Sequence, residues 1–150
     1  MKPVFCSLLL CASFLAVAAA LANEQKNAKR KADVYAELGK APEKARNRRN
    51  PLENDPDAAA AGRLLFEDHC AECHGDYALG GKKGPSLRAP EVQNAEPGAI
   101  FWVLSNGVVR KGMPVWSRLP EPQRWQLVRY VKSLGIAEPA SSAREAAPKP

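Results

Sequence analysis

Hydrophobic residues recur at helical spacing in three stretches between residues 55 and 134, and no stretch shows the strict alternation of a β-strand. Each stretch begins near a proline, and the last two stop at a glycine, which is the usual order of start and stop signals for a helix. The predicted helices cover residues 55–69, 96–106 and 120–134. The pattern therefore predicts an all-α fold of three or more short helices.

Long loops separate these helices. Residues 75–90 are rich in Gly, Pro and Lys, and residues 107–119 form a second irregular segment that contains Met113. A chain of 150 residues with tails at both ends has room for about one small domain, which we place at residues 57–137. Short helices and long loops give a poor core by themselves, so a bound cofactor is expected to supply the missing apolar volume.

The first 22 residues have the pattern of a secretory signal peptide. Lys2 gives a short basic start, an apolar run covers residues 4–22, and small residues precede the predicted cleavage after Ala22. The mature chain is therefore expected to begin near Asn23 and to lie in the periplasm. Two alternatives stay open, an uncleaved segment that anchors the chain in the membrane and a lipid attached to Cys11.

Basic residues are concentrated in residues 23–56, which we expect to be a largely disordered arm. Residues 23–50 hold nine Lys or Arg against four Asp or Glu, while the whole chain has a formal charge of +6. Few large apolar residues occur here, so the arm cannot bury enough surface to fold alone. In an exported protein, an arm of this kind suits an acidic protein surface or peripheral contact with an anionic membrane rather than nucleic acid. The alternative that the arm is a solvated tail and binds nothing stays equally open. Residues 138–150, rich in Ala, Ser and Pro, are expected to be a second disordered tail.

Two cysteines remain after removal of the signal peptide, Cys70 and Cys73, and His74 follows the second. This CAECH pattern is typical of covalent haem c attachment. Two thiols one helical turn apart can reach both vinyl groups on one haem edge, and the next imidazole then lies beneath the iron. One alternative is a redox-active dithiol, but this needs a βαβ pattern that is absent. The other is a zinc site, for which the mature chain offers no third cysteine and only His69 besides His74.

A haem iron has a second axial position, for which His69 and Met113 are the candidates in the mature chain. His69 directly precedes Cys70 on the attachment side, whereas Met113 lies in a separate Gly-Met-Pro segment. Glycine lets the backbone approach a haem, proline stiffens the loop, and a thioether is a soft ligand suited to haem iron. The sequence therefore favours Met113, and the alternative that it only fills a gap in the core stays open.

With these motifs, residues 58–137 resemble the class I cytochrome c family, an all-α fold of short helices and long loops wrapped around one haem. The resemblance implies that Pro85, in a GPSL segment, accepts a hydrogen bond from His74. It also implies that Met113 and Trp116 contact the haem from the methionine loop. Packing between the first and last helices is implied for Gly62, Phe66, Leu127 and Tyr130.

The likeness is closest to small bacterial cytochromes that serve quinoprotein dehydrogenases or terminal oxidases, and residues 101–107 (FWVLSNG) contribute to it. It implies a monomeric electron-transfer protein of a respiratory chain, not an enzyme. Such a protein would accept electrons from a dehydrogenase or quinol-oxidising complex and pass them to an oxidase or another cytochrome. A peroxidase or gas sensor with displaceable Met113, and a cytochrome subunit of a larger oxidoreductase, stay open as alternatives. Four cations form either a docking rim or solvated loop charges: Lys82, Lys83, Arg110 and Lys111.

Overall fold

The computed structural model describes residues 20–26, 29 and 33–136. The chain divides into two compact units, Met1–Ala36 and Glu37–Pro150. Most of the predicted signal peptide and the whole predicted C-terminal tail lie outside the described residues. None of the helices in the described ranges has the length and apolar character needed to cross a membrane.

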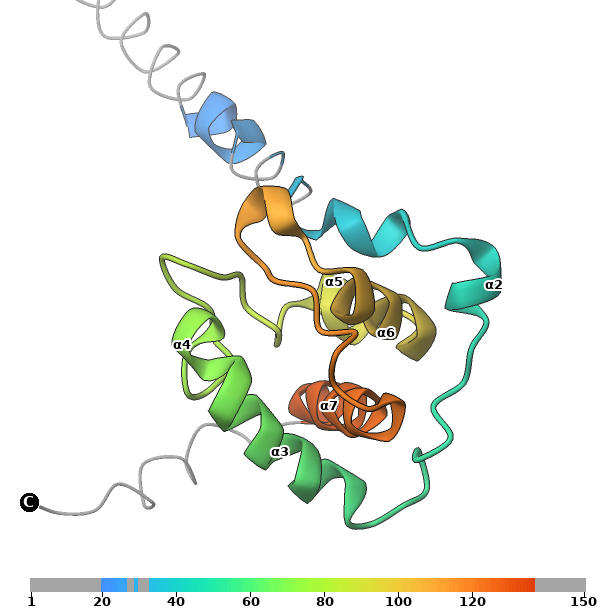
Figure 1. Ribbon diagram of the computed structural model, residues 1–150. Coiled ribbons are helices and arrows are strands. Elements are labelled where there is room, and N and C mark those ends of the chain that lie inside the picture. The colour runs from blue at the N-terminus through green and yellow to red at the C-terminus, as the bar shows by residue number, and fades with distance from the viewer. Residues whose placement is uncertain (1–19, 27–28, 30–32, 137–150) are drawn as a thin grey trace, which may run out of the picture. The chain divides into compact units, whose positions relative to one another are not determined.

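The second unit is helical, which confirms the predicted all-α class (Figure 1). Within the described part of the chain, the only strand-like feature is a single antiparallel bridge between Val108 and Met113. The helices are α2 (Glu43–Arg46), α3 (Ala58–His69), α4 (Ala71–His74), α5 (Pro90–Gln93), α6 (Pro97–Asn106) and α7 (Glu121–Ser133), with 3₁₀ turns η1 (Val109–Lys111) and η2 (Leu134–Ile136).

The three longest helices of the second unit, α3, α6 and α7, match the predicted ones closely because their ends carry strong local signals. Pro97 is at the first position of α6, where a missing N–H costs nothing, and α7 also has a proline in its first turn. Gly107 ends α6 with a positive φ of 66°. The short helices α2, α4 and α5 were not predicted, since a single turn leaves little periodicity to recognise.

The first and last of these long helices, α3 and α7, cross in close contact (Figure 1). Gly62 makes the crossing possible, because a Cβ atom there would lie 2.0 Å from the carbonyl oxygen of Gln126. Further along, the rings of Phe66 and Tyr130 pack with centroids 5.3 Å apart. These contacts, with the buried Leu127, confirm the predicted packing between the two helices.

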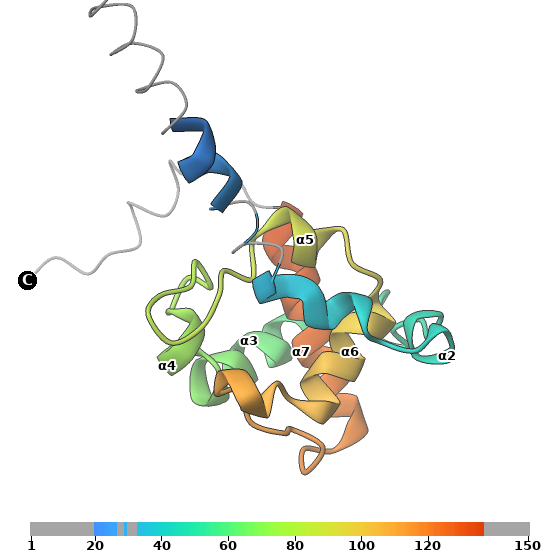
Figure 2. The same ribbon diagram turned by 90° about the horizontal axis from the view of Figure 1, so that it is seen from above.

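Residues 37–56 differ from the expected largely disordered arm, because they pack against α6 and α7 (Figure 2). Ala41 and Asn50 are only 3% and 6% exposed, and the Asn50 side-chain Nδ2 donates to the carbonyl oxygen of Trp125 at 3.0 Å. The Arg48 guanidinium lies 4.6 Å from the ring centroid of Phe101. The segment is fixed by amide and guanidinium contacts rather than by large apolar side chains, so its polar composition did not reveal it.

Candidate functional site

Cys70 lies between two helices, at the point where α3 ends and α4 begins. Its backbone φ of −122° breaks the helical path, and its carbonyl oxygen accepts hydrogen bonds from the N–H groups of Cys73 and His74 at 3.1 and 2.9 Å. Both thiols are free and partly buried. The structure therefore brings the three predicted attachment and ligand residues together on one tight turn.

The imidazole of His74 is oriented by the chain itself. Its Nδ1 lies 2.8 Å from the carbonyl oxygen of Pro85, and since that oxygen only accepts, Nδ1–H donates. Gly84 permits this approach, because a Cβ atom there would lie 3.1 Å from Nδ1 of His74 and 2.9 Å from the carbonyl oxygen of Cys73. The hydrogen bond predicted for Pro85 is present, and it leaves the lone pair of Nε2 available to a metal.

The loop that carries Pro85 is held in place by contacts that sequence reasoning missed. The N–H of Leu87 donates to the carbonyl oxygen of Ala78 at 2.9 Å. The Arg88 guanidinium donates to the carbonyl oxygens of Tyr77, at 2.7 Å, and Leu134, at 3.1 Å. Arg88 thus ties the loop to the end of α7, and only its position directly after the GPSL segment hinted at a role.

The methionine loop, residues 107–119, folds back on itself. Val108 and Met113 exchange both backbone hydrogen bonds, at 3.0 and 3.2 Å, and Gly112 takes a left-handed φ of 88° at the turn. The N–H of Trp116 donates to the carbonyl oxygen of Leu104 in α6 at 3.2 Å. Met113 and Trp116 both pack partly buried against the hydrophobic core.

His69, the alternative candidate for the second axial position, lies beside an aromatic ring of the methionine loop. Its ring faces that of Trp116, with centroids 5.3 Å apart and planes inclined by 40°. The sequence did not predict this pair, because the two residues are far apart in the chain and no motif contains both of them.

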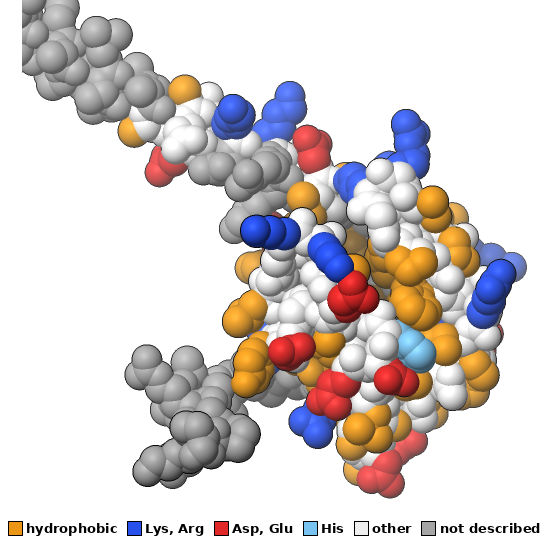
Figure 3. Space-filling model, turned by 60° about the vertical axis from the view of Figure 1, so that its left-hand side comes forward, with side chains coloured by type: hydrophobic (Ala, Val, Ile, Leu, Met, Phe, Trp, Pro, Cys, Tyr) orange, Lys and Arg blue, Asp and Glu red, His pale blue; other side chains and the backbone are white. Residues whose placement is uncertain are grey.

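The residues present fit a haem c. The core around Phe66 and Leu104 is covered by hydrophobic side chains that remain only partly buried. On the face that Figure 3 shows, hydrophobic side chains gather beside a histidine. The donor set offers an imidazole nitrogen, a thioether and two thiols, which is the set that a covalently attached haem requires. The partly buried side chains are Leu65, Cys70, Ala71, Leu87, Met113, Trp116, Leu119 and Tyr130.

The two alternative readings of the cysteines find no support. Burial raises the pKa of the Cys70 thiol to about 11, with a smaller contribution from the neighbouring Cys73, whereas a reactive dithiol needs a lowered pKa. No group of three or more His, Cys, Asp or Glu side chains in the described residues is placed to hold a metal ion, which argues against zinc.

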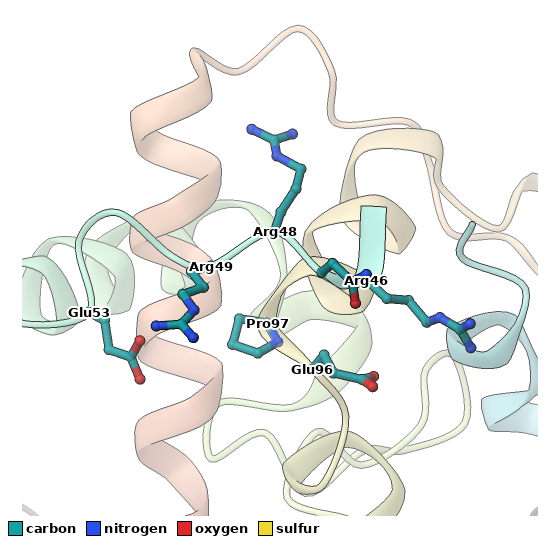
Figure 4. Close-up of a pocket in the computed structure, with 7 residues that line it drawn as sticks. Arg46, Arg48, Arg49, Glu53, Glu96 and Pro97 are labelled. Carbon is teal, nitrogen blue, oxygen red and sulfur yellow. The ribbon is translucent and has the colours of Figure 1, made fainter. Parts of the chain in front are cut away.

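A polar hollow of about 610 Å³ lies where α2 meets the start of α6, and it is separate from these residues. Its walls are charged, and the side chains of Arg46, Arg48 and Arg49 point in different directions (Figure 4). Charged walls do not suit an apolar porphyrin. The remaining lining residues are Asn47, Glu53, Glu96 and Pro97.

The fold and the site together define a c-type cytochrome domain. Residues 57–131 match the family described as cytochrome c oxidase, cbb3-type, subunit III. The chain belongs to this family of class I c-type cytochromes, whose members bind haem c. The predicted family and the predicted class of electron-transfer protein are thereby confirmed.

Similar proteins include subunits of cbb3-type oxidases and a quinohemoprotein alcohol dehydrogenase. The chain is 38% identical over 108 residues to the cbb3-type cytochrome c oxidase subunit CcoP of Rubrivivax gelatinosus, covering 71% of this chain and 34% of that one. It is 33% identical over 93 residues to the subunit FixPc of Rhizobium leguminosarum bv. viciae, covering 55% and 30%. Over 75 residues it is 33% identical to the quinohemoprotein alcohol dehydrogenase ADH-IIG of Pseudomonas putida, covering 49% and 10%. The chain spans about a third or less of the length of these curated relatives.

Proposed function

We propose that this chain is a periplasmic one-electron carrier that holds a single haem c through Cys70 and Cys73, with His74 and Met113 as axial ligands. One haem is proposed because the sequence contains one CAECH motif. The observation that carries the proposal is the hydrogen bond from Nδ1 of His74 to the carbonyl oxygen of Pro85, at 2.8 Å. This bond fixes the tautomer in which Nε2 can ligate iron.

Haem c, when bound, supplies an iron that changes between the ferric and ferrous states. The chain's own residues decide how that iron behaves. Thioether bonds from Cys70 and Cys73 would prevent loss of the cofactor, and ligation by both His74 and Met113 would leave no position on the iron for oxygen or peroxide. A methionine rather than a second histidine favours the ferrous state, so we propose a positive midpoint potential.

Electrons are proposed to come from a dehydrogenase or a quinol-oxidising complex and to pass to an oxidase or another cytochrome. The supporting observation is that the relatives with similar sequences include both a quinohemoprotein alcohol dehydrogenase and subunits of cbb3-type oxidases. Cell fractionation together with N-terminal sequencing tests the compartment. We expect the mature chain in the periplasm with Asn23 near its first residue.

The direct test of the sixth ligand replaces Met113 with alanine in protein matured by a host that attaches haem. Met113→Ala is expected to remove the methionine-to-iron absorption band and to lower the midpoint potential. Val115→Ala, an exposed position of the same loop that is 45% accessible, is the matched control and should change neither. If Met113→Ala leaves both unchanged, the proposed ligand is wrong.

A second candidate is an electron-transfer subunit that stays bound to a larger oxidoreductase, because several relatives are named as oxidase subunits. Deleting residues 23–36 tests it without disturbing the packed segment that follows. Loss of a co-purifying partner would favour the bound subunit, and unchanged association would argue that this segment holds nothing.

A peroxidase or gas sensor with a displaceable Met113 makes the opposite prediction about ligand binding. Ferrous protein that binds carbon monoxide rapidly would favour the sensor. A ferrous protein that stays low-spin and inert to carbon monoxide is expected for the carrier, because both axial positions are filled.

A further inference from the structure

The ring pair of His69 and Trp116 connects two segments that the proposed haem site needs to keep together. His69 is the last residue of α3 and immediately precedes Cys70. Trp116 follows Met113 by three positions in the methionine loop. Their centroids are 5.3 Å apart at an interplanar angle of 40°, a geometry in which aromatic rings attract each other.

The backbone hydrogen bonds of the methionine loop join it to itself and to α6, and its apolar side chains also pack on the core that contains Phe66 of α3. The paired hydrogen bonds of Val108 and Met113 join the loop to itself, and the N–H of Trp116 joins it to Leu104 in α6. The N–H of Leu119 donates to the carbonyl oxygen of Trp116 at 3.0 Å, which is again a bond within the loop. The indole of Trp116, against the imidazole of His69, adds a ring contact between the loop and the last residue of α3, directly before the attachment turn.

We propose that His69 is a positioning residue, which acts through Trp116 to hold the methionine loop closed and so slows displacement of Met113 from the iron. This inference rests on the proposed function, since it presupposes a methionine–iron bond. The contact is made by a flat ring, so another flat ring at position 69 should preserve it. A competing explanation is that His69 merely occupies the last position of α3, in which case His69→Ala would leave the loop as it is in the unmodified protein.

The test measures the rate at which imidazole replaces the methionine ligand in the full-length ferric holoprotein. At saturating imidazole, the rate of ligand replacement is limited by the rate at which the loop opens. The loss of the methionine-to-iron absorption band over time measures this opening rate. We expect His69→Ala to raise this rate about two- to tenfold, which is the contribution of one such ring pair. We expect His69→Phe to restore a rate close to that of the unmodified protein.

Two controls separate loop positioning from general weakening. Asp68→Ala changes the exposed neighbour of His69 on the same helix and should leave the opening rate unchanged. Asn50 is far along the chain from the loop, and Asn50→Ala removes its hydrogen bond to the carbonyl oxygen of Trp125. This variant should lower overall stability without raising the rate of methionine displacement.

Each outcome has one meaning. A wild-type spectrum without the methionine-to-iron band would overturn the proposed ligand and this inference with it. A normal band, with His69→Ala opening at the wild-type rate, would overturn the positioning role alone. The same holds if His69→Phe opens as fast as His69→Ala, or if Asn50→Ala accelerates opening to the same extent.

Discussion

Nδ1 of His74 donates a hydrogen bond to the main-chain oxygen of Pro85, eleven residues further along the chain, at 2.8 Å. A carbonyl acceptor makes the imidazole a stronger electron donor to any metal at Nε2. The loop around Pro85 therefore helps to set the electronic character of the proposed iron ligand, and not only its direction.

Gly84→Ala is expected to raise the midpoint potential. The new Cβ atom would lie 2.9 Å from the carbonyl oxygen of Cys73, so the loop must move away and the hydrogen bond to His74 weakens. A weaker bond reduces electron donation by the imidazole and destabilises the ferric state. Gly81→Ala, whose Cβ atom would meet nothing within 4 Å, is the control for potentiometric titration. Equal potentials for both variants would remove the role given to this bond.

Gly62→Ala should destabilise the domain, although alanine is the better helix former by about 1 kcal/mol. The added Cβ atom would lie 2.0 Å from the carbonyl oxygen of Gln126, and both atoms sit on backbone that cannot turn aside. We expect a loss of about 1–3 kcal/mol or more in the free energy of unfolding, measured with denaturant and circular dichroism. Gly39→Ala, at a helical position with nothing within 4 Å, should show no such loss.

Asn50→Ala tests the packing of residues 37–56 on the domain. The buried side chain of Asn50 donates to the carbonyl oxygen of Trp125 at 3.0 Å and accepts from the N–H of Leu52 at 2.9 Å. Removing it leaves a partly buried backbone donor without this acceptor, which costs about 1–3 kcal/mol. Thermal or denaturant unfolding of Asn50→Ala against the exposed Asn54→Ala measures the difference. Equal stabilities would mean that the segment adds nothing to the fold.

Electron transfer with a small anionic oxidant tests whether four loop cations act as a basic docking rim: Lys82, Lys83, Arg110 and Lys111. Oxidation by ferricyanide is expected to slow as ionic strength rises, because salt screens attraction between the rim and the anion. Lys83 already pairs with Glu72 at 2.6 Å, so Lys82→Ala should reduce the rate more than Lys83→Ala. A rate that is independent of salt would exclude the rim from docking.

The long helices and the attachment site were predictable because their signals are local. Prolines and glycines mark the ends of α6, and the CAECH motif needs only five consecutive residues. The contact between His74 and Pro85 was predictable only through the family resemblance, since nothing in the spacing of the two residues implies it.

Residues 37–56 could not be predicted from composition, because their contacts use groups that usually face water. Arg48 lies over Phe101 and pairs with Glu121, and Asn50 reaches a backbone oxygen of α7. A search for apolar periodicity passes over such contacts. The pair of His69 and Trp116 was missed for a related reason, since it depends on how the methionine loop and the end of α3 meet in space.

The central claim is that a single haem is bound covalently at Cys70 and Cys73. The most direct measurement is the haem content of full-length protein, matured in a haem-attaching host, after denaturation and extraction with acidified acetone. We predict one haem per chain that stays with the polypeptide, and its loss from a variant in which both cysteines are replaced by alanine. Extractable haem, or colourless protein with two titratable thiols at Cys70 and Cys73, would contradict the account.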